Sequence, residues 1–185
     1  MVRFRLVTLL FVLLACVGHG VAQAATIETE RVGVLYVDSD RILGEALVAK
    51  DIRAQIDRRR TELQGTFSRR SEKLHQEEEE LIKQKGILSS DAFEAKVMEF
   101  RQSVDTMNRD VETKMAELEA MYSNAIGQVY EKIQQISKQV ADSEGAAMVL
   151  FMTRGQVPFV VSSVDITEKI LEILNKDLSR VSLGD

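Results

Sequence analysis

The sequence has little proline, cysteine, histidine or aromatic residue, and each shortage excludes a class of protein. Its 185 residues include one proline, one cysteine, two histidines and no tryptophan, and aromatic residues make up 5% of the chain. Because proline interrupts helices, its near absence favours long helices. Two histidines and one cysteine are too few for a multi-ligand zinc site and offer little for nucleophilic catalysis. We therefore expect a helical protein that is not an enzyme and uses no metal or cofactor.

The first 24 residues are predicted to be a signal peptide. Two arginines precede an apolar run from Leu6 to Val17, which is too short to cross a bilayer comfortably. Small residues in Ala22-Gln-Ala24 favour cleavage between Ala24 and Ala25. In an alternative interpretation the segment is a lipoprotein signal and Cys16 carries the lipid. Both interpretations predict an exported protein.

Cleavage at this site changes the charge and removes the only thiol. It takes away two of the 24 basic residues and none of the 29 acidic ones, which leaves a net charge of −7. Without cysteine, the exported chain has no disulfide to stabilise it. An acidic chain also gives little basis for a nucleic-acid partner. Packing alone must stabilise this protein.

Two long helical patterns fill the middle of the chain. Apolar residues recur at intervals of seven from Ile56 to Leu88, and a more regular stripe runs from Phe93 to Val140. Between them, the turn-forming stretch from Gly86 is followed by Ser90 and Asp91, either of which could cap the second helix. We predict an antiparallel coiled-coil hairpin over residues 45–144 with its tip at about 84–92.

The seam of this hairpin is predicted to thin toward the tip. The companion heptad positions after Leu63 hold Arg70 and Glu77, so the distal half of the first helix has about one apolar residue per two turns. We expect this half to be mobile. Gly65 and Gly127 lie inside the predicted helices, where they act either as hinges or as tolerated residues.

Short apolar segments at both ends of the chain predict a small β-rich body. A strand is expected at 32–37, and a buried strand at 146–152 is expected to form a hairpin with 159–161. Asp165 to Glu168 has the spacing of a capping box and opens a short C-terminal helix. The predicted fold is therefore α+β, with the helical hairpin inserted in a body formed by residues 25–44 and 145–185.

The composition of the predicted body favours an oligomer. About 60 residues make a marginal core, and short apolar strands with open edges would aggregate in a monomer, so pairing across subunits is the economical solution. The residues assigned to this oligomerisation surface are Val32, Val34, Tyr36, Met148, Leu150, Phe159 and Ile170.

Three segments carry a resemblance to a known family. They are the strand and cap at 32–43, the tip Leu88-Ser-Ser-Asp-Ala-Phe-Glu-Ala-Lys96, and the stretch Val164-Asp-Ile-Thr-Glu-Lys-Ile-Leu-Glu-Ile-Leu-Asn175. In these segments the chain resembles the Skp (OmpH-like) periplasmic chaperones. The resemblance implies a homotrimer in the periplasm whose helical hairpins surround a cavity for unfolded outer-membrane proteins. It implies no ATP and no metal.

The charge of this chain departs from the family pattern, because the best-known member is strongly basic. Attraction to lipopolysaccharide or to an anionic membrane needs a polybasic patch, so we do not transfer that activity. Basic residues do cluster locally, and they are either solvated, paired across the hairpin or able to steer acidic client segments. These candidates are Arg58, Arg59, Arg60, Lys83, Lys85 and Lys96.

Client contact is expected from apolar residues that lie off the hairpin seam, since the stripe from Phe93 to Val140 is needed for packing between the helices. Several such residues acting together would give weak, multivalent contact. The candidates are Val48, Ile82, Ile87, Met98, Tyr122 and Tyr130.

The expected function is ATP-independent holding of unfolded outer-membrane β-barrel proteins, which prevents their aggregation on the way to the outer membrane. The alternative is an exported coiled-coil adaptor that docks to a folded envelope partner through its tip. An enzyme is a third alternative, but the sequence shows no nucleophile and base pair, no phosphate-binding loop and no metal cluster to support it.

Overall fold

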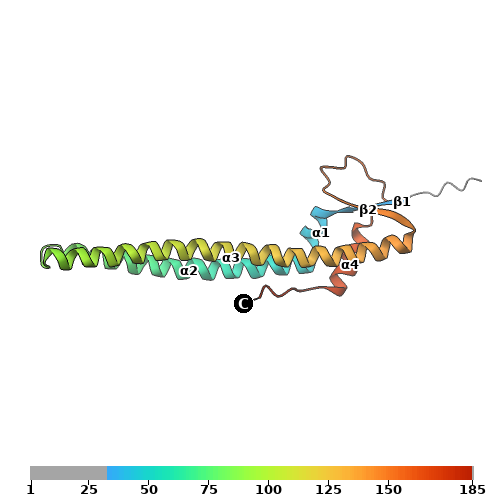
Figure 1. Ribbon diagram of the computed structural model, residues 1–185. Coiled ribbons are helices and arrows are strands. Elements are labelled where there is room, and N and C mark those ends of the chain that lie inside the picture. Colours follow the sequence, from blue (N-terminus) through green and yellow to red (C-terminus); the bar gives the residue numbers. More distant parts are fainter. Residues whose placement is uncertain (1–32, 185) are drawn as a thin grey trace, which may run out of the picture. The chain divides into compact units, whose positions relative to one another are not determined.

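A computed structural model describes residues 33–184 of the chain. The predicted signal peptide, its Ala24–Ala25 cleavage site, Cys16 and Val32 lie outside these described residues. The α+β fold and the inserted helical hairpin are confirmed (Figure 1). The elements in chain order are β1 (Gly33–Asp38), α1 (Ser39–Glu45), α2 (Leu47–Gln84), α3 (Ser90–Glu144), β2 (Ala146–Met152) and α4 (Thr167–Asp177).

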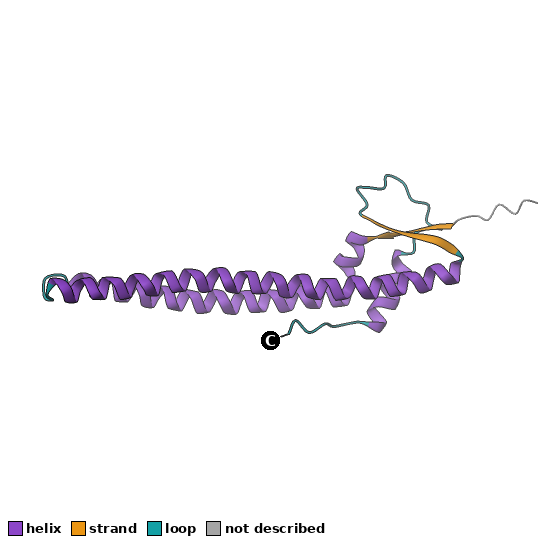
Figure 2. Cartoon of the chain, viewed as in Figure 1, coloured by secondary structure: helices purple, strands orange, loops and turns teal. Residues whose placement is uncertain are grey.

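Helices α2 and α3 form the hairpin, and Figure 2 shows them side by side with a short loop at the tip. At about 1.5 Å per residue, the 55 residues of α3 extend about 80 Å. Ser89 caps α3, since its hydroxyl accepts a hydrogen bond from the amide of Ala92. The prediction of Ser90 or Asp91 as the cap was therefore wrong by one or two residues. As predicted, α3 ends at Glu144, and Gly145 after it adopts the left-handed conformation that glycine favours.

The helical structure is interrupted at Ala46, between α1 and α2, although no proline marks this position in the sequence. Ala46 has an extended ψ of 135°, and other parts of the chain satisfy the backbone groups that the break leaves free. The Arg53 guanidinium donates to the carbonyls of Leu43 and Gly44, at 2.8 and 3.2 Å. The side-chain oxygen of Asn175 in α4 accepts from the Leu47 amide at 2.8 Å. Asn175 is 128 positions from Leu47 in sequence, so the local helical pattern does not reveal the break.

The hydrophobic core lies at the root of the hairpin, where α2, α3, α4 and β1 meet. On α3 the buried residues run from Leu118 to Val140 and follow the predicted stripe. On α2 burial stops at Ile56, and the seam residues from Leu63 to Leu81 are only half-buried. The predicted thinning of the seam toward the tip is therefore confirmed. The largest fully buried apolar side chains are Val37, Ile42, Val48, Ile52, Val129, Ile133, Ile136, Ile170 and Leu174.

Strands β1 and β2 pair in parallel, with Tyr36 opposite Leu150 and Val37 opposite Phe151. The predicted hairpin between 146–152 and 159–161 was wrong, because residues 159–161 form no strand. Pro158 lacks the amide hydrogen that a ladder needs, and the other side of β1 is bridged by the segment around Asp165. There the Tyr36 amide donates to the Val164 carbonyl at 2.8 Å.

Thr167 joins α4 to β1 through its hydroxyl. The Thr167 Oγ1 accepts from the buried Asp38 amide at 2.9 Å and donates to the Asp165 carboxylate at 2.5 Å. Asp165 also accepts from the Thr167 amide, whereas Ile166 is the residue at the cap position of α4. The predicted capping box is therefore replaced by an Asp165–Thr167 pair.

We expect Thr167→Val to lower the free energy of unfolding by about 1–3 kcal/mol, since it leaves a buried amide without a partner. Thr167→Ser keeps the hydroxyl and should cost less. Chemical denaturation followed by circular dichroism measures both variants. Equal stability of the valine and serine variants would show that the hydroxyl contributes nothing.

Candidate functional site

One face of the two-stranded sheet is apolar and exposed. The inward side chains Leu35 and Val37 are buried, whereas the alternate residues Val34, Met148 and Leu150 point away from the core and are exposed. Met148 has half of its surface accessible. Alternation along a strand places these residues on one surface. The described part of the chain thus presents exposed apolar side chains on this sheet face, although Tyr36, which alternates with Val34 on the same face, is covered.

The loop after β2 adds to the apolar surface of the body. Phe159 is 78% exposed, and Val161 is also exposed. In the described residues β1 lies between β2 and the bridge at Asp165, so β2 keeps an unpaired outer edge. An open edge and an apolar face are both features that oligomers cover.

Two residues assigned to the oligomerisation surface are buried within the chain itself. Tyr36 is 6% exposed, because the segment at 164–166 pairs with it and its hydroxyl lies 3.4 Å from the Met152 carbonyl oxygen. Ile170 is fully buried, because it faces the core from α4. Neither side chain is free to contact another subunit, so these two assignments were wrong.

Tyr36 should make the body sensitive to alkali. Burial, and then the negative charges of Asp38 and Asp165, raise the pKa of Tyr36 above its ordinary value of 10.0. A raised pKa means that the folded state favours the neutral phenol, so its contribution to stability is complete below pH 10 and is lost as the pH rises through the folded pKa. The unaltered chain and the Tyr36→Phe variant are both titrated spectrophotometrically. The difference between the two curves should show a tyrosine that ionises above pH 10. Ionisation at or below that pH would contradict this assignment.

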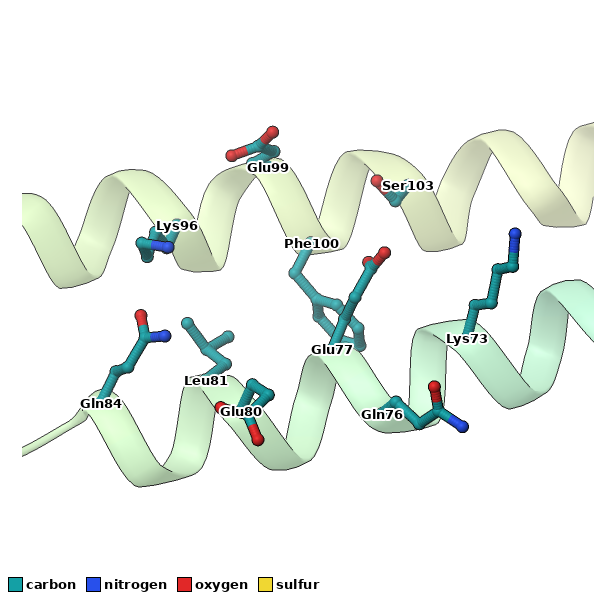
Figure 3. Close-up of a pocket in the computed structure, with 10 residues that line it drawn as sticks. All are labelled: Lys73, Gln76, Glu77, Glu80, Leu81, Gln84, Lys96, Glu99, Phe100 and Ser103. Atoms are coloured by element: carbon teal, nitrogen blue, oxygen red, sulfur yellow. The ribbon is translucent and has the colours of Figure 1, made fainter.

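The distal hairpin contains an open cleft between α2 and α3, with a volume of about 470 Å³. In Figure 3, Leu81 of α2 and Phe100 of α3 lie between the two helices, and charged side chains surround them. A second cleft of about 480 Å³ shares Lys73, Glu77 and Ser103 with the first. Nearby, the ion pair between Arg70 and Asp110, with 2.5 Å between nitrogen and oxygen, takes a position where a coiled coil would place apolar residues. The thin seam therefore leaves apolar side chains accessible within the hairpin.

Three of the predicted client-contact residues are exposed around the tip. Ile82, Ile87 and Met98 each show well over half of their surface, and Ile87 is 80% exposed. Tyr130 is also exposed, nearer the root, whereas Tyr122 is half-buried and packs against the core.

Val48 is fully buried, so its assignment to client contact was wrong. The side chains of Val48, Ile52 and Ile56 follow one another at intervals of four on α2, and all three face the core. The break at Ala46 sets the start of α2 and thereby the direction of Val48.

The predicted basic residues do not form one free patch. Arg60 pairs with Asp57 at 3.0 Å, and Lys83 pairs with Glu80 at 2.7 Å, which raises the pKa of Lys83. Arg59 is half-buried and donates to the Met121 sulfur at 2.9 Å. The remaining three residues are Arg58 and Lys85, which are exposed, and Lys96, which lines the first cleft.

Sequence reasoning missed a contact between the C-terminus and α2. Val181 and Leu183 are buried, and Gln55 and Arg59 of α2 donate hydrogen bonds to the backbone near them. The only signal in the sequence is the alternation of apolar and polar residues at 181–184.

Residues 33–184 contain no cluster of three or more His, Cys, Asp and Glu side chains that could hold a metal ion. Within the same residues, every helix is either too short or too polar to cross a membrane.

The chain was compared with known families, proteins and structures. No curated protein matches the sequence. Among solved structures, the chain is similar to that of a proposed outer-membrane chaperone (OmpH-like) from Caulobacter crescentus CB15, with a TM-score of 0.74 and 21% sequence identity. The similarity covers 81% of this chain and 88% of the other, and at this identity it shows a shared fold. The sequence also matches the family described as outer membrane protein (OmpH-like) over residues 33–174, from the start of β1 into α4. The chain therefore belongs to the OmpH-like family.

Proposed function

We propose that this protein is an ATP-independent periplasmic chaperone that holds unfolded outer-membrane proteins until they reach the outer membrane. Membership of the OmpH-like family supports a chaperone-type function. The observation that carries the finer proposal is the distal hairpin, in which exposed apolar residues and open clefts occur on a scaffold of otherwise charged helices. Such a surface suits weak contact with many apolar segments rather than tight contact with one.

The working unit in this proposal is a homotrimer assembled through the body. The exposed sheet face at Val34, Met148 and Leu150 and the open edge of β2 support assembly, because both would otherwise remain in water. Three subunits would place three hairpins around one client. Each contact is weak, but joining several to one scaffold raises the local concentration of binding groups and hence the overall affinity.

Binding would stabilise the unfolded client, because the clefts and tip recognise side chains that a folded barrel turns to the lipid. Release needs no nucleotide, since folding into the membrane buries the same apolar residues and removes them from the equilibrium. Binding to the chaperone thereby competes with aggregation of the client, and correct folding of the client releases it.

Sedimentation tests this proposal. The chain is sedimented alone and then with an outer-membrane barrel protein diluted from urea. We expect a defined soluble complex with the unfolded barrel, no complex with the folded barrel, and similar results for several unrelated barrels. A chain that leaves the barrel to aggregate, or that selects a single folded partner, would contradict the proposal and favour the adaptor.

Tip variants locate the contact. Ile82→Ser, Ile87→Ser and Met98→Ser together should weaken client binding about tenfold, because they remove exposed apolar surface at about 25 cal/mol per Å². Lys85→Ser with Lys96→Ser is the matched control, since it changes the charge of the same region and keeps the apolar residues. A stronger effect of the lysine pair would show that charge, and not apolar contact, holds the client.

A further inference from the structure

The C-terminal strap, residues 178–184, lies along the root of α2. It follows α4 without regular secondary structure, and its end lies beside the hairpin in Figure 1. Val181 and Leu183 are buried in the core cluster, whereas Ser182 and Gly184 between and after them are exposed. This alternation is that of an extended segment with one apolar side.

Three residues of α2, spaced four apart and therefore on one helix face, contact the strap in order. Asp51 pairs with Arg180 at 3.4 Å, the Gln55 side-chain amide donates to the Val181 carbonyl at 2.9 Å, and the Arg59 guanidinium donates to the Gly184 carbonyl at 2.5 Å. Two of these contacts are hydrogen bonds to backbone carbonyl groups, which every polypeptide has. The recognised features are thus carbonyl groups and apolar side chains at alternate positions, not a particular sequence.

The groove continues where the strap ends. A cavity of about 340 Å³ begins at Arg59 and extends toward the tip. Its lining includes the apolar residues Leu63, Leu118 and Met121, and its other residues are Glu62, Thr66, Lys114 and Glu117. Arg59 links the two parts, because one of its nitrogens donates to the strap and another donates to the Met121 sulfur. The described chain therefore occupies part of a longer groove.

We infer that this groove binds extended segments of unfolded polypeptide with apolar residues at alternate positions, and that the C-terminal strap competes with them for it. Strands of membrane barrels have this alternation of apolar and polar residues. The strap has no regular secondary structure and contacts α2 through side chains and carbonyl groups, so it can leave without breaking the fold of α4. The inference rests on the proposed function for the identity of the segment, and it adds a binding site at the hairpin root together with an intramolecular competitor.

A labelled peptide tests the groove directly. The peptide carries the sequence of residues 178–185, and its binding to the full chain is measured by fluorescence anisotropy. The chain with Val181→Ser and Leu183→Ser, in which the strap is released, should bind it at least tenfold more tightly than the unaltered chain, because an occupied groove lowers the apparent affinity. Equal affinities, or no binding to the released variant, would overturn the inference.

Two controls test what the groove recognises. A peptide of the same composition with its valine and leucine adjacent should bind the released variant at least tenfold more weakly. Adding Arg59→Met to that variant should also weaken binding, since methionine keeps an apolar stem and removes the donor to the carbonyl. Unchanged peptide affinity in both controls would show non-specific apolar binding and would contradict the inference.

Limited proteolysis of the unaltered chain gives a test that requires no variant. Trypsin cleaves after arginine, and the bond after Arg180 lies in the strap, next to the buried Val181. When an unfolded barrel protein is bound, limited trypsin digestion should cleave this bond at least tenfold faster than in the free chain. A bound barrel with unchanged cleavage after Arg180 would overturn the inference and leave the proposed function intact. Failure to bind any barrel would overturn the proposed function, and the peptide would still decide whether the groove binds extended segments.

Discussion

Met148→Asp together with Leu150→Asp should convert the proposed homotrimer into monomers. Both side chains point outward from β2 and are exposed in the single chain, so the variant keeps the core of each subunit. In an assembly they would be buried, and burial of such a side chain contributes about 1.5–3 kcal/mol. About half of each side chain is already covered in the single chain, so losing the two costs about 1.5–3 kcal/mol per interface. That is about tenfold to a hundredfold in association, before the desolvation of two carboxylates is added.

Sedimentation velocity measures this effect. Met148→Leu with Leu150→Met is the control, because these swaps conserve volume and apolar character. The control should sediment as the unaltered protein does, while the aspartate variant should sediment as a monomer with unchanged helicity. An aspartate variant that keeps the mass of a trimer would place the subunit interface elsewhere on the body.

Gly65→Pro should disrupt the hairpin beyond the middle of α2. A proline inside a helix removes one hydrogen bond, clashes with the preceding turn and costs about 3 kcal/mol or more. Gly65 lies within α2 beyond Ile56, the last buried residue of that helix, so little packing on this side of the seam opposes the kink. We expect lower helicity by circular dichroism, faster amide exchange in the distal hairpin and reduced client capacity.

Gly65→Ala is the matched control for the proline variant. A methyl group at this position would lie 3.6 Å from the Arg69 guanidinium, which is an ordinary contact. Alanine should therefore fit and stabilise the helix by about 1 kcal/mol. Unchanged helicity and client capacity in the proline variant would contradict a role for the continuous arm in holding clients.

The parts of the fold that the sequence predicts are those set by neighbouring residues. The heptad stripe from Phe93 to Val140, the left-handed glycine at 145 and the apolar run of β2 each depend on a few adjacent positions. The parallel pairing of β1 with β2 was not predicted, because it depends on where a long hairpin returns the chain. The break at Ala46 was missed for the same reason, since Asn175 and Arg53 stabilise it from outside the local pattern.

The residues of the candidate site also divide into those that the sequence predicts and those that depend on long-range packing. The exposure of Ile82, Ile87 and Met98 was predicted correctly, because an apolar residue off a helical stripe is visible in the sequence. Val48, Tyr36 and Ile170 were misassigned, since each is covered by packing within the same chain. The contact of the strap with Gln55 and Arg59 was not predicted. Its only sign in the sequence is a short alternation of apolar and polar residues, which could not be interpreted without the structure of the groove.

The parallel pair of strands also constrains how the chain folds. Tyr36 and Met152 meet although they are 116 positions apart in sequence, and almost everything between them is the helical hairpin. Closing so long a loop at random is slow, but the two helices form locally, and their antiparallel packing brings the two strands together. During synthesis β1 emerges first and stays unpaired until both helices have followed. A variant that prevents the two helices from packing should therefore also delay the pairing of β1 with β2.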